Sequence, residues 1–202
     1  MSENVLKIGL TGPLGAGKSQ VAKCWQDLGA GIVEGDEMGR LALETDPDLV
    51  LKLAERFGRD ILDENGSIIR RQLANAAFSS REGTKDLTDL TFPSLYRIAN
   101  EHFEKLRDSH DIIIFDAALI FEWGIERDFN LIVVVTAQRD LLLERVMDRL
   151  KIEKKEAFER LSGQLPSRIK EQRADRVIYN NGSLEMLKKN AIIVLDELKR
   201  II

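Results

Sequence analysis

The sequence predicts an α/β protein, with a five-stranded parallel sheet covered by helices on both faces, a helical insertion and a helical lid. Short apolar segments alternate along the chain with longer segments of helical periodicity. The apolar segments carry few polar residues, as expected for strands that are covered on both faces. The first of them leads through a glycine-rich loop into a helix. The five predicted strands span residues 5–10, 31–33, 111–115, 131–135 and 176–179.

The loop after the first predicted strand fits the phosphate-binding pattern of two glycines separated by four residues, followed by Lys and then Ser or Thr. It reads Gly12-Pro13-Leu14-Gly15-Ala16-Gly17-Lys18-Ser19. The helix that follows is amphipathic, with Val21, Cys24, Trp25 and Leu28 on one face. This strand–loop–helix context is the one in which the pattern binds a nucleoside triphosphate.

Each residue type in the loop suits a polyphosphate. Glycines let backbone N–H groups curl around phosphate oxygens, and the N-terminus of the next helix points its own N–H groups at them. Lys18 supplies a full positive charge, and the Ser19 hydroxyl is a suitable ligand for Mg²⁺. Pro13 has no N–H to donate, and Gln20 stands where many such loops have a second hydroxyl residue, so we expect both to reduce affinity.

A long, mostly helical segment at residues 46–108 separates the second and third predicted strands. Asp46-Pro47 predicts a helix N-cap followed by proline at the first helical position, and Pro93 is predicted to open a further helix. The segment is too long for a simple crossover, so we expect a subdomain that holds a second substrate. Arg70 and Arg71 lie where an anionic substrate could bind, although charged helix residues are usually only solvated.

A second helical insertion at residues 141–173 is predicted to form a lid. Arg145 and Arg149 are four residues apart and therefore share a helix face. A mobile lid that carries arginines can neutralise a transferring phosphoryl group and exclude water. The alternative is a solvated face balanced by neighbouring acids, and for this pair we favour the lid. The remaining residues, 1–45, 109–140 and 174–202, are the predicted nucleotide-binding core, whose last helix Ser183 is predicted to cap.

Two carboxylates are predicted at the carboxyl ends of strands, where ligands gather in open parallel sheets. Asp36 follows the second strand and is suited to accept the proton of an attacking hydroxyl. It is equally suited to be the N-cap of a helix over residues 37–43, and both roles can hold. Asp116 follows four apolar residues, the place of a carboxylate near Mg²⁺ in phosphate-loop proteins; the alternative is an ordinary polar residue at a strand end.

The bulk properties exclude several classes of function. The chain has 202 residues, a formal net charge of −4 and a single cysteine. A nucleic-acid-binding protein would usually show a basic stripe, and none is evident. The sequence predicts no signal peptide at its start, and no apolar run in it is long enough to span a membrane. We therefore expect a cytoplasmic monomer or weak oligomer that acts on a small molecule.

Over nearly its whole length the chain resembles the dephospho-coenzyme A kinase family. The resemblance is carried by Thr11-Gly12 through Lys18-Ser19, Asp36 with Arg40, residues 66–73, Leu119-Ile120-Phe121-Glu122, the pair Arg145/Arg149, and Gln164-Leu165-Pro166 leading to Lys170, Ala174-Asp175 and residues 177–183. It implies transfer of the γ-phosphate of ATP to the ribose 3′-hydroxyl of dephospho-coenzyme A, the last step of coenzyme A synthesis. It also implies a five-stranded parallel core, a helical substrate domain and a lid.

The resemblance further implies roles for individual residues. Asp36 is similar to the catalytic carboxylate at the acceptor hydroxyl, Arg149 to the lid arginine on the ATP phosphates, and Asn180 to part of the adenine pocket. Lys18 completes the expected catalytic set, while residues 12–20 and Arg145 are expected to bind ATP. The expected acceptor-binding residues are Arg40, Arg70, Arg71, Phe92, Leu119, Phe121 and Glu122, and the expected Mg²⁺ ligands are Ser19 and Asp116.

The chain also departs from the family pattern. Members usually have Gly at Pro13, Thr at Gln20, His at Phe92, Pro at Ala118 and Asp at Tyr179. These changes fit a divergent true enzyme, a kinase with a shifted acceptor, or a relative that binds ATP without turnover; the retained Lys18, Ser19, Asp36, Asp116 and Arg149 favour an active enzyme. The alternatives are a nucleoside, nucleotide or small-metabolite kinase, and a nucleotide-dependent switch without turnover.

Overall fold

The computed structural model describes residues 5–200 and confirms the predicted five-stranded parallel sheet. The strands are β1 (Leu6–Thr11), β2 (Gly31–Glu34), β3 (Ile112–Asp116), β4 (Leu131–Thr136) and β5 (Arg176–Tyr179), in the spatial order β2-β3-β1-β4-β5. Four strands run one residue beyond their predicted carboxyl ends, onto Thr11, Glu34, Asp116 and Thr136. The ladder uses backbone groups, so it extends over polar residues that an apolar pattern leaves out.

The described residues divide into two compact units. One unit contains the sheet and comprises the described parts of residues 1–34 and 103–202, and the other is residues 35–102. The sheet unit also contains α1 (Lys18–Asp27), α6 (Ile120–Trp123), α7 (Arg139–Leu150), α8 (Lys154–Ser162), α9 (Ser167–Arg173) and α10 (Leu184–Lys199). A short 3₁₀ helix, η2, spans Glu126–Asp128.

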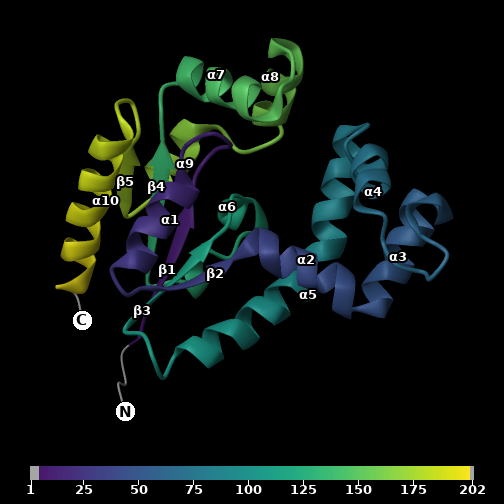
Figure 1. Ribbon diagram of the computed structural model, residues 1–202, viewed down its shortest axis with the longest axis horizontal. Coiled ribbons are helices and arrows are strands. Elements are labelled where there is room, and N and C mark those ends of the chain that lie inside the picture. The colour runs from purple at the N-terminus through teal and green to yellow at the C-terminus, as the bar shows by residue number, and fades with distance from the viewer. Residues whose placement is uncertain (1–4, 201–202) are drawn as a thin grey trace. The chain divides into compact units, whose positions relative to one another are not determined.

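One face of the sheet packs against α1 and α10, which lie side by side (Figure 1). Ile8, Leu10 and Val135 are buried on this face. Trp25 of α1 is fully buried, and its Nε1 donates to the carbonyl oxygen of Ala191 at 2.8 Å, which ties α1 to α10. The predicted Ser183 cap is confirmed, because its hydroxyl accepts a hydrogen bond from the N–H of Met186.

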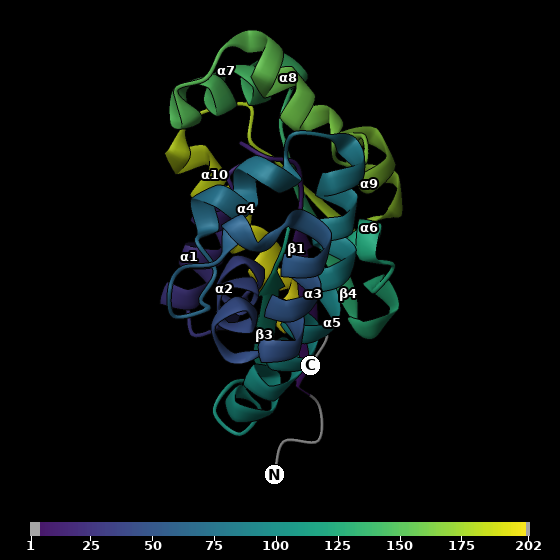
Figure 2. The same cartoon turned by 90° about the vertical axis from the view of Figure 1, so that its right-hand side faces the viewer.

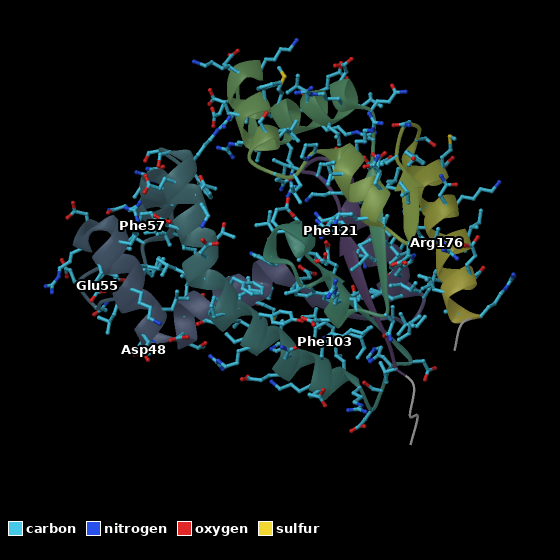
Figure 3. All side chains as sticks on the ribbon, turned by 180° about the vertical axis from the view of Figure 1, so that it is seen from behind. Asp48, Glu55, Phe57, Phe103, Phe121 and Arg176 are labelled. Carbon is cyan, nitrogen blue, oxygen red and sulfur yellow. The ribbon has the colours of Figure 1, made fainter. Side chains whose placement is uncertain are left out.

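The other face of the sheet is covered by aromatic rings and by short helices. The rings of Phe115 and Phe129 stack with centroids 5.8 Å apart, and Phe103 from the last turns of α5 packs 5.9 Å from Phe115. Figure 3 labels Phe103 on its helix and Arg176 on the edge strand β5. Strand β3, which contains Phe115, and strand β1, which leads into the phosphate loop, are thus packed on both faces.

The helical unit contains α2 (Gly35–Thr45), α3 (Pro47–Phe57), η1 (Arg59–Ile61), α4 (Arg70–Ala77) and most of α5 (Arg81–Leu106). The predicted cap at Asp46 is confirmed, because its carboxylate accepts from the N–H of Leu49 at 3.1 Å. The prediction that Pro93 opens a helix is wrong, since Pro93 lies inside α5. A proline within a helix removes one backbone hydrogen bond, and burial of Leu95, Ile98 and Ala99 just after it offsets that loss.

No helix in residues 5–200 combines the length and the apolar character that crossing a membrane requires.

Candidate active site

The loop between β1 and α1 has the backbone geometry of a phosphate-binding nest. Gly12, Gly15 and Gly17 have φ values of 149°, 80° and 96°, which L-amino acids rarely adopt. A Cβ at Gly12 would lie 2.0 Å from the carbonyl oxygen of Val135, and one at Gly17 would lie 2.6 Å from Nδ2 of Asn180. Glycine is therefore required at both positions, for its conformation and for its small size.

Side chains from two other elements hold this loop. Nδ2 of Asn180, which follows β5, donates to the carbonyl oxygen of Ala16 at 2.8 Å. On the other side, the N–H of Leu14 donates to Oε1 of Gln164 at 3.1 Å. Gln164 precedes α9 and Asn180 follows β5, so segments distant in sequence brace the loop. The expected role of Asn180 in an adenine pocket stays a prediction, and its side-chain amide already supports the loop.

Lys18, in the first turn of α1, comes close to Asp116, the last residue of β3. Nζ of Lys18 lies 3.9 Å from Oδ1 of Asp116, and their side chains are only 16% and 12% exposed. Ser19 is exposed in the first turn of α1. This arrangement can bind a cation and an anion at once, with Asp116 and Ser19 offering hard oxygen ligands and Lys18 a positive charge.

The two arginines of the predicted lid differ in their surroundings. Arg149 is exposed, whereas Arg145 is half-buried beside the phosphate loop, where a Cβ built on Gly15 would lie 3.5 Å from the Cβ of Arg145. Within residues 5–200, the Nη1 atom of Arg145 is buried and has no hydrogen-bond partner. A buried donor without an acceptor is costly, so Arg145 fits a site in which an anion sits against the loop. Helices α7 and α8 lie side by side in both views (Figure 1, Figure 2).

Asp36 lies in the first turn of α2, two residues after Glu34 of β2. Glu34 is the register partner of Asp116 on β3. The prediction that Asp36 is an N-cap is wrong, because α2 begins one residue earlier, at Gly35. The strand passes into the helix without an intervening loop, and the carboxylate of Asp36 is exposed.

Several predicted acceptor-binding residues of the helical unit are basic, and they differ in how they are paired. Arg40 pairs with Glu37 and, at 3.2 Å, with Glu44, and these contacts raise the pKa of Arg40 above its ordinary value. Arg70 also pairs with Glu44, at 2.5 Å. Arg71 is exposed and makes no ion pair with any described residue. Arg71 is therefore the guanidinium in this group that is most available to an anion.

Phe92 stacks on Tyr96 one helical turn away, with ring centroids 5.4 Å apart and planes 20° apart. The chain therefore presents an aromatic ring at a position where the family resemblance led us to expect a polar side chain. Both rings are half-buried.

The segment after β3 holds the last three predicted acceptor-binding residues. Leu119 is half-buried, and Phe121 is only 4% exposed, with the guanidinium carbon of Arg173 lying 4.6 Å from its ring centroid (Figure 3). Oε1 of Glu122 lies 2.8 Å from Nζ of Lys170 and accepts from the N–H of Leu165 at 2.9 Å. Their contact with an acceptor remains a prediction, while Phe121 and Glu122 also hold α9 in place.

Sequence reasoning gave no individual role to Gln164 and Lys170. Both belong to a stretch that carried the family resemblance, yet no residue pattern indicates that Gln164 contacts the phosphate loop or that Lys170 is buried. The available signal was weak: two polar side chains flank Leu165-Pro166 at the end of the lid segment.

A hollow in the helical unit has none of the predicted site residues in its lining. It is lined by Leu90 and by the charged residues Lys52, Glu55, Arg56, Asp86 and Asp89. Arg56 pairs with Asp86 at 2.5 Å, and Lys85 pairs with Asp89 at its rim. Three of its five charged residues, Arg56, Asp86 and Asp89, are thus already paired, and we assign no chemistry to this hollow.

A parallel sheet whose central strand leads into a phosphate loop, with a lysine, a carboxylate and an arginine beside that loop, defines a phosphate-loop kinase. Comparison with known proteins narrows this class. The sequence profile described as dephospho-CoA kinase matches residues 6–186. The chain therefore belongs to the dephospho-CoA kinase family.

Individual relatives agree with this family. The chain is 34% identical over 195 residues to the dephospho-CoA kinase of Syntrophotalea carbinolica, covering 96% of this chain and 92% of that protein. A crystal structure from Thermus thermophilus superposes with a TM-score of 0.80 at 30% identity, covering 97% of this chain and 99% of the other. The dephospho-CoA kinase of Campylobacter jejuni gives a TM-score of 0.70 at 23% identity, over 96% and 97% of the two chains, and so supports the fold alone.

Proposed function

We propose roles for individual residues of this chain in the dephospho-CoA kinase reaction. That reaction transfers the γ-phosphoryl group of ATP to the ribose 3′-hydroxyl of dephospho-CoA and gives coenzyme A and ADP. The observation that carries the proposal is the Lys18–Asp116 pair at the mouth of a glycine nest. In the reaction, the 3′-oxygen forms a bond to the γ-phosphorus, and the bond from that phosphorus to the oxygen shared with the β-phosphate breaks. The proton of the hydroxyl leaves to a base.

On the ATP side, the protein supplies position and charge. Backbone N–H groups of the loop bind the phosphates together with the N-terminus of α1, although Pro13 has no N–H and that of Leu14 donates to Gln164. Lys18 stabilises charge that develops on the oxygens during transfer. Arg145 and Arg149 add positive charge from the lid. The unsatisfied Nη1 of Arg145 supports this role, because a phosphate oxygen would give it an acceptor.

Mg²⁺ fits the same place. No cluster of three or more His, Cys, Asp or Glu side chains occurs in residues 5–200. Nucleotide-bound Mg²⁺ usually takes only one or two protein oxygens, the rest coming from phosphates and water, so Ser19 and Asp116 form a sufficient donor set. When bound, the ion would neutralise charge on the outer phosphates.

On the acceptor side, Asp36 is proposed as the base. A carboxylate at the carboxyl end of a strand can hold the 3′-hydroxyl in line with the γ-phosphorus and take its proton. Dephospho-CoA carries a diphosphate, and Arg71, with Arg40 and Arg70 as paired neighbours, is proposed to bind it. Phe92, Leu119, Phe121 and Glu122 are proposed to lie near the rest of the acceptor.

These roles assign a function to each part of the chain. Residues 1–45, 109–140 and 174–202 are proposed to bind the nucleotide, residues 46–108 the acceptor, and residues 141–173 to act as the lid. A cytoplasmic location, a monomeric or weakly oligomeric state and the absence of nucleic-acid binding remain predictions from the sequence.

An acceptor panel tests the proposal. ADP release from Mg²⁺-ATP is measured with dephospho-CoA, adenosine, AMP, pantetheine and shikimate, each at the same concentration. We expect dephospho-CoA to raise the rate of ADP release far above the rate without an acceptor. The other compounds should leave it near that rate. Equal stimulation by another alcohol, or none by dephospho-CoA, would overturn the proposal.

A further inference from the structure

Of the charged side chains in residues 5–200, only that of Lys170 is buried, with 0% of its surface exposed. The other buried polar residues in this range are Thr11, Thr136 and Asn180, and they end or follow β1, β4 and β5. Lys170, from α9, contacts Ala118, which follows β3, so all four residues lie at the carboxyl edge of the sheet, near the phosphate loop. A buried ammonium group is costly unless it is paired and hydrogen-bonded, so its partners are informative.

Lys170 is hydrogen-bonded on the loop side. Its Nζ donates to the carbonyl oxygen of Ala118 at 2.7 Å. The same oxygen accepts a hydrogen bond from Oγ1 of Thr11 at 3.1 Å. Thr11 is the last residue of β1 and directly precedes the phosphate loop. One carbonyl thus links Lys170 to the point at which the loop begins.

Lys170 also forms an ion pair with Glu122 of α6. Nζ lies 2.8 Å from Oε1 of Glu122, and that oxygen accepts from the N–H of Leu165 at 2.9 Å. The residue before Leu165 is Gln164, whose Oε1 accepts from the N–H of Leu14 in the phosphate loop at 3.1 Å. The turn between α8 and α9 is therefore attached to the phosphate loop through Gln164 and to Glu122 through the next residue, Leu165.

The charges in this cluster influence one another. Burial lowers the pKa of Lys170, the carboxylate of Glu122 opposes that shift, and the positive charge of Lys18 adds to it. Lys170 thus lies close enough to the phosphate-binding lysine to feel its charge. Glu122 is the carboxylate that balances it.

We propose that Lys170 and Glu122 are a positioning pair, which holds the phosphate loop and the α8–α9 turn in the geometry that ATP requires. This proposal rests on the function proposed above. Neither residue needs to touch ATP for this role. Lys170 acts through Ala118 and Thr11, and Glu122 acts through Leu165 and the neighbouring Gln164.

Four variants separate positioning from simple stabilisation. Lys170→Met leaves the carboxylate of Glu122 buried without its partner, and Lys170→Arg keeps the charge and the donors. The double variant Lys170→Met/Glu122→Met removes both charges at similar volume, which often restores stability. Lys155→Met, at an exposed lysine of α8, is the matched control. Melting temperature, KM for ATP and KM for dephospho-CoA are measured for each.

We expect Lys170→Met to raise KM for ATP by about 10- to 100-fold, by analogy with the loss seen when a hydrogen-bond partner that orients a metal ligand is removed. KM for dephospho-CoA should stay within about twofold, and the melting temperature should fall. In the double variant the melting temperature should recover while KM for ATP stays high. Lys170→Arg should rescue most of the ATP affinity, and Lys155→Met should change nothing.

The proposal is overturned if KM for ATP recovers together with the melting temperature in the double variant, or if Lys170→Met leaves KM for ATP unchanged. If Lys170→Met and the double variant both fail to fold, Gln164→Leu provides the test, because it removes the contact with the phosphate loop without leaving a buried charge. A raised KM for ATP in Gln164→Leu supports the proposal, and an unchanged one contradicts it. Should the parent enzyme not use dephospho-CoA, equilibrium dissociation constants for Mg²⁺-ATP replace KM, so positioning is tested even if the acceptor is wrong.

Discussion

The Nζ atom of Lys18 lies 3.9 Å from Oδ1 of Asp116, across two adjacent strands of the sheet. Lys18 begins α1 and Asp116 ends β3, so the pair marks the point where the phosphate loop meets the strand beside it. Both side chains are largely shielded from water. Charges held in this way need little rearrangement when a polyphosphate binds, which is the physical basis of electrostatic catalysis.

Replacing Lys18 with alanine should lower turnover by about 10²–10³, the scale for losing a group that is already positioned to stabilise developing charge. The readout is ADP release that depends on dephospho-CoA. Lys23→Ala is a matched control, because Lys23 is an exposed lysine of the same helix that pairs with Asp27. Equal loss in both variants would show that the effect comes from the helix rather than from the charge at the loop.

Asp36→Asn should lower kcat by about 10²–10⁴, because the amide cannot accept the proton of the acceptor hydroxyl. Affinity for ATP should remain nearly intact. Asp48→Asn is the control, since Asp48 is also an acid in the first turn of a helix, α3, and is labelled in Figure 3. Full activity of Asp36→Asn would reduce Asp36 to a helix-terminal carboxylate.

Gly17→Ala should weaken ATP binding strongly, and Gly29→Ala should not. Their φ values are nearly equal, at 96° and 95°, so both substitutions carry a similar backbone strain of about 1–2 kcal/mol. Only at Gly17 does the added Cβ meet another atom, Nδ2 of Asn180 at 2.6 Å; at Gly29 it meets nothing within 4 Å. Chemical unfolding and ATP titration of the two variants therefore separate strain from displacement of the loop. Similar ATP affinities in the two would contradict the role of Asn180 in bracing the loop.

Substitutions of the two arginines of the predicted lid should change different kinetic parameters. Arg145→Met should raise KM for ATP by about 10- to 100-fold, since a charged hydrogen bond contributes about 1.5–3 kcal/mol. Arg149→Met, at an exposed position, should lower kcat by about 10³ or more if the lid brings Arg149 to the transferring phosphoryl group. Arg160→Met, at an exposed arginine of α8 that pairs with Glu156, serves as the control. Wild-type kinetics in Arg149→Met would remove it from the catalytic set.

The stability of the protein relative to its Lys170→Met variant should rise with pH. Burial lowers the pKa of Lys170 below its ordinary value of 10.5 in the folded state, with Glu122 opposing the shift. Between the lowered pKa and 10.5 the unfolded chain binds more protons at this residue than the folded chain, so unfolding becomes harder as pH increases. Urea unfolding of both proteins at several pH values up to about 10 measures the difference. A difference that falls with pH would contradict the shift.

The fold was largely predictable because its strands are apolar and because the residues that begin and end several elements are easy to recognise. The glycine-rich loop, the apolar run before Asp116 and the caps at Asp46 and Ser183 are local signals, and all lie where the sequence indicates. The prediction for Pro93 was wrong because the proline lies inside a long helix, and the residues buried just after it outweigh its local cost. Asp36 was misplaced as a cap because β2 passes directly into α2.

Contacts between distant segments could not be predicted in the same way. Gln164 and Leu14 are 150 residues apart, and Lys170 meets the carbonyl of Ala118 at a separation of 52 residues. A lysine in a polar helix is normally assigned to the surface, and here α9 packs against β4 with Ala118 and Glu122 at the Nζ of the buried lysine. The family pattern pointed to this stretch, but the reason for it is visible only in three dimensions.

The decisive measurement is the product of the complete reaction. Purified protein is incubated with Mg²⁺-ATP and dephospho-CoA, ADP and coenzyme A are quantified together, and the phosphorylated position is assigned by phosphorus and proton NMR. We expect one ADP for each coenzyme A, with the new phosphate on the ribose 3′-oxygen. A phosphate on another oxygen, or ADP release that ignores dephospho-CoA, would show that the phosphate loop and Asp36 do not serve this transfer.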